Sequence, residues 1–138
     1  MGRDKITIRT SSGSALTPLD IFDIILHHLA KISEDKKSPH IRIYKPFDGF
    51  VADYVLVIGA QNLIHVKALA TDLEKCLLTY APQLPTHFFD RPKLSGNGES
   101  GWMILDSLSI VIHIMTNDVR HFYEIDSLFE ERSRVYEL

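Results

Sequence analysis

The sequence contains one cysteine, one tryptophan and no long apolar run. A single cysteine, Cys76, excludes an intramolecular disulfide and predicts a reducing compartment. Because Cys76 lies in an apolar helical pattern and cysteine is often buried, we expect a buried thiol rather than a nucleophile. No segment reaches the roughly 18 apolar residues that a transmembrane helix needs. We therefore expect a protein without a membrane span.

Motifs of the common catalytic and metal-binding classes are also missing. The sequence has no phosphate-binding loop, no Cys-x-x-Cys pair, no His-Glu-x-x-His and no Gly-x-Ser-x-Gly. His27 and His28 are neighbours in a predicted helix, where they diverge by about 100° and are poorly placed to bind one ion. Glu124 and Asp126 would diverge by about 200° on a second predicted helix. We predict no metal, no cofactor and no enzymatic activity.

Length and charge indicate one soluble domain. At 138 residues the chain can bury a core without disulfides, and a net charge of −3 argues against a surface devoted to nucleic acid. Residues 1–15 have the composition of a flexible N-terminal arm, or of what remains after removal of an organellar transit peptide. We predict the folded domain over residues 16–131 and a C-terminal tail over residues 132–138, with residues 130–134 as a solvated helix end.

Hydrophobic periodicity predicts alternating helices and strands before residue 100. Thr17 can cap a helix over residues 18–33, and Asn62 can cap a second helix that Pro82 ends. Residues 40–45 alternate polar and apolar, as in a strand near a sheet edge, whereas residues 53–59 are typical of a buried strand. Residues 82–100 hold several prolines and glycines and are expected to be a loop, with residues 86–89 as a short strand.

The densest apolar stretch, residues 98–115, is interrupted by Asp106-Ser107-Leu108-Ser109. This pattern predicts two strands joined by a tight turn. Apolar residues occupy both faces of both strands, so we expect helices to cover the sheet on both sides. A helix should follow over residues 116–131. The predicted fold is α/β, with helices packed on a small mixed β-sheet.

Individual side chains in this stretch have structural interpretations beside functional ones. His113 lies on an apolar strand and is interpreted as a hydrogen-bonded core histidine rather than a base. Asp106 is interpreted as a turn residue whose carboxylate accepts backbone N–H groups. Trp102 fits a core position, but tryptophan with Arg120 and Tyr123 nearby is also the composition of interface hot spots.

Two sequence blocks stand out. The first runs from Gly101-Trp102-Met103-Ile104-Leu105-Asp106 through Val111-Ile112-His113-Ile114 to Arg120-His121-Phe122-Tyr123 and Leu128-Phe129. The second joins Ala52-Asp53-Tyr54-Val55-Leu56-Val57-Ile58-Gly59 to His65-Val66-Lys67-Ala68. Both blocks closely resemble the Iojap-like ribosomal silencing factor (RsfS) family. The chain departs from the family pattern at Ser107-Leu108-Ser109 in the hairpin turn, at Leu63-Ile64 and at Phe129. These departures indicate a divergent member.

The resemblance implies a nucleotidyltransferase-like topology without catalytic carboxylates, and a role in translation repression. Family members bind a protein on the inter-subunit face of the large ribosomal subunit and block subunit joining, and organellar members act in large-subunit biogenesis. The protein-binding residues implied by this resemblance are Trp102, Leu105, Asp106, Arg120 and Tyr123, and those supporting the geometry are Asp53, Tyr54, His65 and His113. Asp106 and Glu99 would face a basic partner.

Several alternatives stay open at this point. The altered turn favours a scaffold that recruits other assembly proteins, and the fold kinship leaves a residual nucleotide-binding enzyme as a weaker hypothesis. A homodimer is a further property of some relatives. We expect a mitochondrial or other organellar matrix location, with the bacterial cytoplasm as the alternative.

Overall fold

A computed structural model describes residues 8–9, 15–16, 18–47, 52–87 and 89–138. Its helices are α1 (Pro18–Asp35), α2 (Leu63–Tyr80), α3 (Asn117–Tyr123) and α4 (Ile125–Arg132), with short 3-10 helices at Ala81–Gln83 and Gly98–Ser100. Its strands are β1 (Ile8–Arg9), β2 (Ala15–Leu16), β3 (Ile41–Pro46), β4 (Tyr54–Ala60), β5 (Phe89–Asn97), β6 (Trp102–Leu108), β7 (Ile110–Thr116) and β8 (Ser133–Val135). The expected cap at Thr17 and most of the expected N-terminal arm lie outside the described residues.

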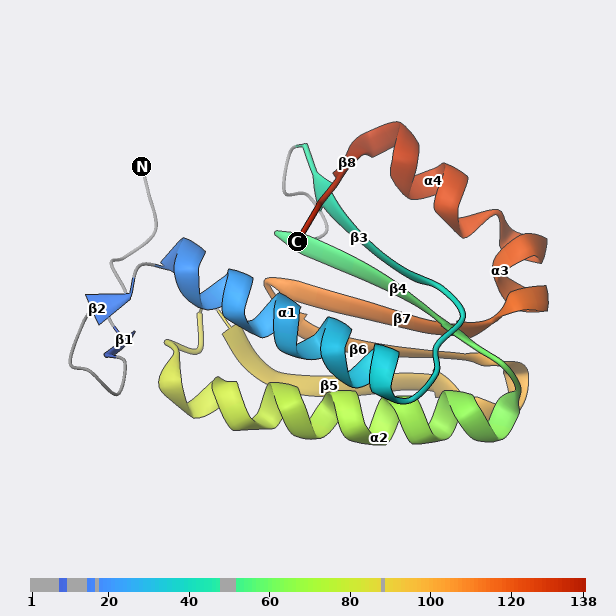
Figure 1. The fold of residues 1–138 in the computed structure, drawn as a ribbon, viewed down its shortest axis with the longest axis horizontal. Coiled ribbons are helices and arrows are strands. Elements are labelled where there is room, and N and C mark those ends of the chain that lie inside the picture. The colour runs from blue at the N-terminus through green and yellow to red at the C-terminus, as the bar shows by residue number, and fades with distance from the viewer. Residues whose placement is uncertain (1–7, 10–14, 17, 48–51, 88) are drawn as a thin grey trace.

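Six of these strands form one mixed sheet in the order β5-β6-β7-β4-β3-β8 (Figure 1). Strands β4 and β7 are parallel, from Tyr54 opposite Ile110 to Ala60 opposite Thr116, and the other neighbours are antiparallel. Strands β6 and β7 form the predicted hairpin, with Ser109 alone between them. The predicted α/β class with a mixed sheet is confirmed.

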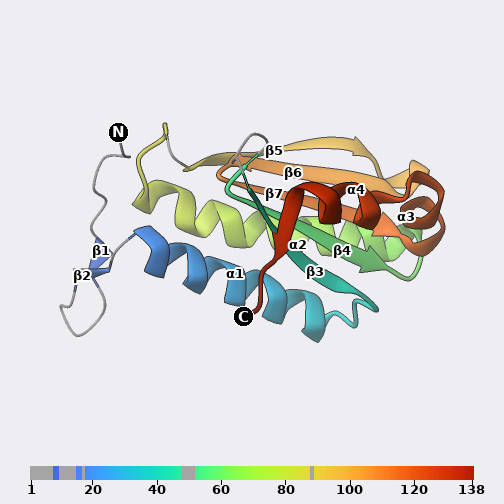
Figure 2. The same ribbon diagram turned by 90° about the horizontal axis from the view of Figure 1, so that it is seen from above.

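Helices cover the sheet on both sides, as the two-sided apolar pattern predicted (Figure 2). Helices α1 and α2 pack on one face against Leu56, Ile112 and other residues of a large core. Helices α3 and α4 lie on the opposite face, over a smaller core that contains Val57 and Val111. Every residue of β4 is buried, because this strand is central and covered twice. We refer to these surfaces as the α1/α2 face and the α3/α4 face.

The long helices begin and end close to their predicted positions. Helix α1 ends at Asp35, two residues later than expected. The Asn62 side chain accepts a hydrogen bond from the His65 backbone N–H at 2.8 Å, which confirms the predicted cap of α2. None of the described helices is long and apolar enough to cross a membrane.

The single helix predicted over residues 116–131 is wrong, because the chain breaks at Glu124. This residue has φ 49° and ψ 44°, in the left-handed region, and it separates α3 from α4. A glutamate is not a usual signal for the end of a helix, so the spacing of the apolar residues predicts one continuous helix across the break. The break turns the two helices away from a common axis over the α3/α4 face (Figure 2).

The loop predicted over residues 82–100 is also wrong, because residues 89–97 form the edge strand β5. Its pairing with β6 is irregular between Phe89 and Lys93, the segment that contains Pro92. Proline is tolerated at an edge or a bulge, where its missing N–H breaks no ladder bond. At Gly96, with φ 89°, an added Cβ would lie 2.5 Å from the Trp102 carbonyl oxygen. The proline and glycines that suggested a loop therefore shape an edge strand.

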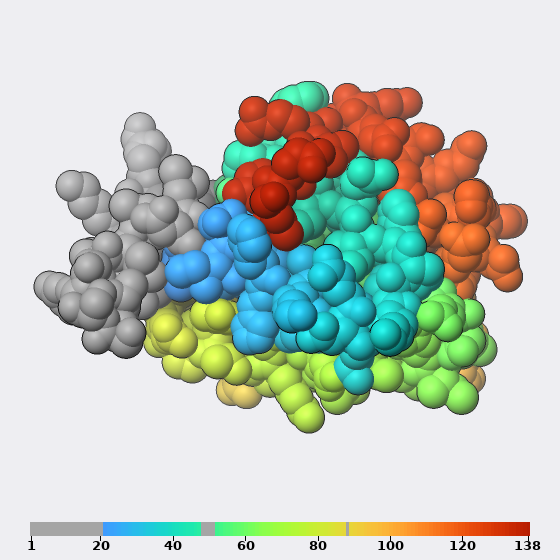
Figure 3. Space-filling model, in the orientation of Figure 1, coloured from blue at the N-terminus to red at the C-terminus, as the bar shows by residue number. Residues whose placement is uncertain are grey.

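The segment expected as a C-terminal tail contains strand β8, which pairs with β3 through Tyr44 opposite Val135. As a result β3 is not the edge strand of the sheet. Beyond β8, the Tyr136 hydroxyl donates to Asp23 of α1 at 2.9 Å. The last residues accordingly lie against the N-terminal part of α1 (Figure 3).

Candidate protein-binding surface

Trp102 and His113 form a hydrogen-bonded pair on the α3/α4 face. Trp102 begins β6, and His113 lies opposite Ile104 on β7. The Trp102 indole N–H donates to His113 Nδ1 at 3.1 Å, so the neutral imidazole carries its proton on Nε2. Burial lowers the pKa of His113 to about 4. The predicted hydrogen bond of His113 is confirmed, and its side chain is half-buried rather than fully enclosed in the core.

These two rings belong to a continuous row of aromatic side chains, which we call the aromatic row. In order, it consists of Phe129, His113, Trp102, Tyr123 and Phe122. Successive ring centroids are separated by 5.5, 5.8, 5.1 and 4.9 Å. The row begins in the smaller core, where Phe129 stacks on Tyr44, and it ends at the surface. Tyr123 is 54% exposed and Phe122 is 79% exposed.

The exposed end of the aromatic row has the composition of a protein contact. Isolated apolar residues are common on protein surfaces, but here two exposed rings contact each other, and Tyr123 also contacts the half-buried Trp102. Leu128 of α4 is also half exposed. Aromatic rings bury a large area while few rotatable bonds are fixed, which makes them frequent binding hot spots. The structure brings together Trp102 and Tyr123 as the sequence indicated, and it adds Phe122.

Arg120, which the sequence grouped with Trp102 and Tyr123 as a contact residue, is directed inward. Its side chain is only 12% exposed, and its Nε lies 2.8 Å from Asp126 Oδ2. The Tyr44 hydroxyl donates to Asp126 Oδ1 at 2.8 Å, and His40 Nε2 lies 3.6 Å from the same oxygen. We call Tyr44, His40, Arg120 and Asp126 the Asp126 cluster. Arg120 therefore has little surface to offer a partner.

The Asp126 cluster is partly dehydrated, and its titrating groups respond accordingly. Burial and the hydrogen bond to Asp126 raise the pKa of the Tyr44 hydroxyl. Burial and the Arg120 charge lower the pKa of His40 despite the nearby carboxylate. At Gly59 an added Cβ would lie 3.0 Å from His40 Cβ and 3.3 Å from Arg120 Nη1. The glycine that ends the buried strand motif thus leaves space for this cluster.

Leu105 and Asp106 occupy different surroundings from the aromatic row. Leu105 is fully buried on the α1/α2 face, so its predicted contact with a partner is not supported and its place is in the core. Asp106 is exposed, and its Oδ1 accepts the Leu108 N–H at 2.9 Å, which confirms the predicted turn role. Asp106 shares a face with Trp102 but lies four residues along β6, which corresponds to about 13 Å.

The predicted supporting residues are separated in the same way. Tyr54 is buried on the α1/α2 face, where its ring contacts Phe22 and Tyr136. The backbone N–H of Asp53 donates to the Ser109 carbonyl, at the hairpin end of the sheet. These two residues lie away from the aromatic row. Tyr54 is opposite Ile110, at the start of β7, whereas Trp102 is opposite Met115, near the end of the same strand. They support the central strands rather than the exposed rings.

His65 connects two loops at the other end of the sheet. Its Nδ1 accepts the Gln61 N–H at 2.9 Å, which leaves Nε2 to donate to the Lys36 carbonyl at 2.7 Å. These two bonds join the segment before α2 to the segment after α1. His65 is thus a structural residue, and only His113 among the predicted supporting residues belongs to the aromatic row.

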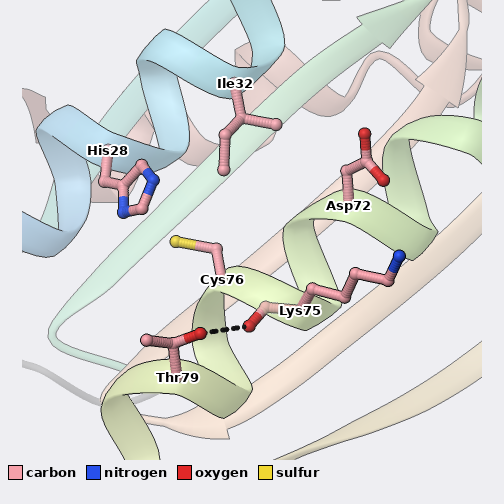
Figure 4. Close-up of a pocket in the computed structure, with 6 residues that line it drawn as sticks. All are labelled: His28, Ile32, Asp72, Lys75, Cys76 and Thr79. Carbon is pink, nitrogen blue, oxygen red and sulfur yellow. Dashed lines mark hydrogen bonds between the residues drawn. The ribbon is translucent and has the colours of Figure 1, made fainter.

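A hollow of about 270 Å³ lies between α1 and α2, on the opposite side of the sheet from the aromatic row (Figure 4). Cys76 lines it together with His28 and Thr79, whose hydroxyl donates to the Lys75 carbonyl at 2.9 Å. Burial raises the pKa of the Cys76 thiol to about 11, so a reactive thiolate is disfavoured and the predicted buried thiol is confirmed. Among the residues that the structure describes, no three His, Cys, Asp or Glu side chains group to hold a metal ion.

Comparisons with known proteins agree on one family. The family model described as ribosomal silencing factor during starvation matches residues 20–138. The ribosomal silencing factor RsfS of Bacillus subtilis (strain 168) is 25% identical over 107 residues, which cover 76% of this chain and 84% of that protein. This relative is bacterial, so the organellar location expected from the sequence receives no support from it.

Solved structures share the fold. A crystal structure of a protein from Bacillus halodurans matches with a TM-score of 0.62 and 20% identity, over 84% of this chain and 99% of that one. A second, from Chromobacterium violaceum, matches with a TM-score of 0.63 and 21% identity, over 84% and 92% of the two chains.

Proposed function

This chain belongs to the RsfS family of ribosomal silencing factors, and from that premise we propose that it binds a protein on the inter-subunit face of the large ribosomal subunit. By occupying that face it sterically blocks joining of the small subunit. Such a mechanism involves no chemical step and needs only a contact area of ordinary size, about 800 Å² on each partner. We accordingly assign the protein no enzymatic activity.

The observation that carries this proposal is the exposed end of the aromatic row. Phe122 and Tyr123 present their rings to solvent at the tip of α3, and Trp102 supports them from β6. A partner that covers these rings removes apolar area from water at about 25 cal/mol per Å². The support beneath them is preformed, so binding orders few additional side chains. We assign Trp102, Tyr123 and Phe122 to the centre of the interface.

The test is sedimentation of the protein through sucrose with separated large and small subunits, at low and moderate salt. We expect comigration with the large subunit alone, and survival at moderate salt because the contact is mainly apolar. Absence from the large-subunit fraction would contradict the proposal. A companion assay would measure how far the protein reduces reassociation of the two subunits.

Replacing both exposed rings, Phe122→Ala with Tyr123→Ala, is expected to weaken large-subunit binding between tenfold and a hundredfold. The loss corresponds to about 1.4 to 2.8 kcal/mol, as for the removal of hot-spot residues. The matched control is Ile64→Ala, because Ile64 is 81% exposed, like Phe122, but lies on α2. Equal binding of the double variant and the wild type would remove the aromatic row from the interface.

Asp106→Arg is expected to weaken binding to a basic partner while the protein stays folded. The roughly 13 Å from Trp102 to Asp106 is within the reach of one interface of ordinary size. The control is Asp106→Asn, which keeps an oxygen that can accept the Leu108 N–H but removes the charge. Circular dichroism would verify folding. Unchanged binding of Asp106→Arg would exclude Asp106 from the interface.

A scaffold that recruits other assembly proteins is the second candidate function. It is favoured by a separate apolar pair, Leu63 and Ile64, which are 43% and 81% exposed at the start of α2. Leu63 lines a hollow together with Thr116, Asn117 and Asp118 at the start of α3, whereas Ile64 lines another with Lys36 and Lys37 after α1. A second protein that binds on the Ile64 side would therefore approach from α1 rather than from the aromatic row. Purified ribosomal subunits without other assembly proteins distinguish the two candidates. Only the silencing function predicts that the protein binds under these conditions.

A further inference from the structure

Asp126 connects three elements of the α3/α4 face. It lies in the first turn of α4, where its Oδ1 accepts the hydroxyl hydrogen bond of Tyr44 from β3 at 2.8 Å. Its Oδ2 lies 2.8 Å from Nε of Arg120 on α3. One carboxylate thus joins both short helices to the sheet. Its two shortest contacts use different oxygens, so neither competes with the other.

Helix α3 depends on such a connection because its other anchor is small: Val119 is a partly buried residue that packs against the smaller core. The helix has only seven residues, none of which is buried. A helix of this length is not stable by itself in water, so its position must come from tertiary contacts. It is followed directly by Glu124 in the left-handed conformation, which a non-glycine residue adopts only when its surroundings impose it. The pair of Arg120 and Asp126 spans this break.

Tyr123 and Phe122 are carried by the last turn of α3, directly before the break. Tyr123 has its ring 5.1 Å from Trp102 and 4.9 Å from Phe122. A shift of α3 relative to the sheet would separate these rings from Trp102. The residues that fix α3 therefore also fix the exposed end of the aromatic row.

We propose that Asp126, acting through Arg120, is a positioning residue of the partner-binding surface: its carboxylate fixes α3 so that Tyr123 lies against Trp102 and Phe122 lies against Tyr123. The inference rests on the proposed function for its effect on binding, but its structural part can be measured on the free protein. It also gives Arg120 an internal role in place of the direct contact that the sequence suggested.

Loss of the carboxylate charge should move α3 rather than leave it in place. Among the residues that the structure describes, none accepts a hydrogen bond from the buried Nη1 of Arg120. Its Nε is paired with the Asp126 carboxylate. A buried guanidinium without a counter-charge is strongly disfavoured. The exposed short helix can move outward to hydrate Arg120, whereas the buried strand β4 beneath it cannot move.

The experiment compares Asp126→Asn with Asp23→Asn. Asp23 is the matched control because it accepts a tyrosine hydroxyl, that of Tyr136, at 2.9 Å, but on α1 and away from the aromatic row. Trp102 is the only tryptophan of the chain, so its emission reports directly on the neighbouring Tyr123. We expect Asp126→Asn to shift the emission of Trp102 to longer wavelength and to weaken large-subunit binding about tenfold. Asp23→Asn should change neither.

A second comparison separates positioning from general loss of stability. In a protein that already carries Phe122→Ala and Tyr123→Ala, Asp126→Asn should cause no further loss of binding, because the rings it positions are gone. Asp126→Glu, which keeps the carboxylate, should recover most of the emission and binding. An equal loss from Asp126→Asn in both backgrounds would overturn the proposal, as would wild-type emission and affinity in the single variant. If the wild-type protein fails to bind the large subunit, the proposed function fails, whereas the emission of Asp126→Asn still decides the positioning role.

Discussion

Leu105→Ala is expected to lower the free energy of unfolding by about 3 kcal/mol, the usual size for a leucine removed from a well-packed core. Leu105 has no exposed surface, and it lies in the core between the sheet and α1/α2, opposite Ile112 of β7 and Leu94 of β5. Its removal leaves a cavity that the paired strands cannot easily close. Urea denaturation followed by circular dichroism measures the change.

The control for Leu105→Ala is Leu94→Ala, its partner across the strand pair. Leu94 is 46% exposed on the edge strand, so we expect a loss of unfolding free energy below about 1 kcal/mol.

The same proteins test the contact role that the family motif suggested for Leu105. The folded fraction of Leu105→Ala should bind the large subunit as well as the wild type does. A loss of binding without a loss of stability would instead show that Leu105 contacts the partner.

The central strands could be predicted because local and long-range preferences agree there. Residues 53–59 and 101–115 are rich in β-branched and apolar residues on both faces, and only a sheet covered twice accommodates such strands. The cap of α2 at Asn62 and the hydrogen-bonded His113 follow from equally local rules. In each case one stretch of sequence contains the whole signal.

The break at Glu124 and the strands β5 and β8 could not be predicted in this way. Glu124 adopts a left-handed conformation within a pattern of helical spacing, so the reason for the break lies in tertiary contacts such as that between Arg120 and Asp126. Strand β5 contains Pro92 and ends in glycine and asparagine, which locally favour a turn. Strand β8 has only three residues, and it forms because it pairs with the outer edge of β3.

Only part of the binding surface could be predicted, because residue type alone identifies some of its members. Trp102 and Tyr123 stand out by residue type, and they do meet in the structure. Phe122 was not selected, because an exposed phenylalanine and a buried one look alike within a helical pattern. Arg120 was selected for a contact, but only the fold shows that its partner is Asp126, six residues along and beyond a helix break. The distinction between a contact residue and a positioning residue thus required the structure.

Acidification from pH 6.5 to pH 4 is expected to destabilise the protein by up to about 3 kcal/mol through His113. The folded pKa of His113 is about 4, below the ordinary value of 6.5, because burial disfavours the charged imidazolium. Between these two values the unfolded chain binds more protons than the folded one. The stabilisation is therefore complete above pH 6.5 and is lost as the pH falls towards 4. The difference between 6.5 and about 4 corresponds to about 3 kcal/mol.

The test is urea denaturation of the wild type and of His113→Asn at several pH values. Asparagine keeps an acceptor near the position of Nδ1 but stays neutral throughout, so its variant should lose less stability over this pH interval. The lowered pKa of His40 acts in the same direction in both proteins, and the difference between them therefore isolates His113. Protonation of Nδ1 also removes the acceptor of the Trp102 N–H, so the emission of folded Trp102 should titrate near pH 4. Equal pH dependence in the two proteins would show that His113 is not the group responsible, and that its imidazole stays hydrated within the aromatic row.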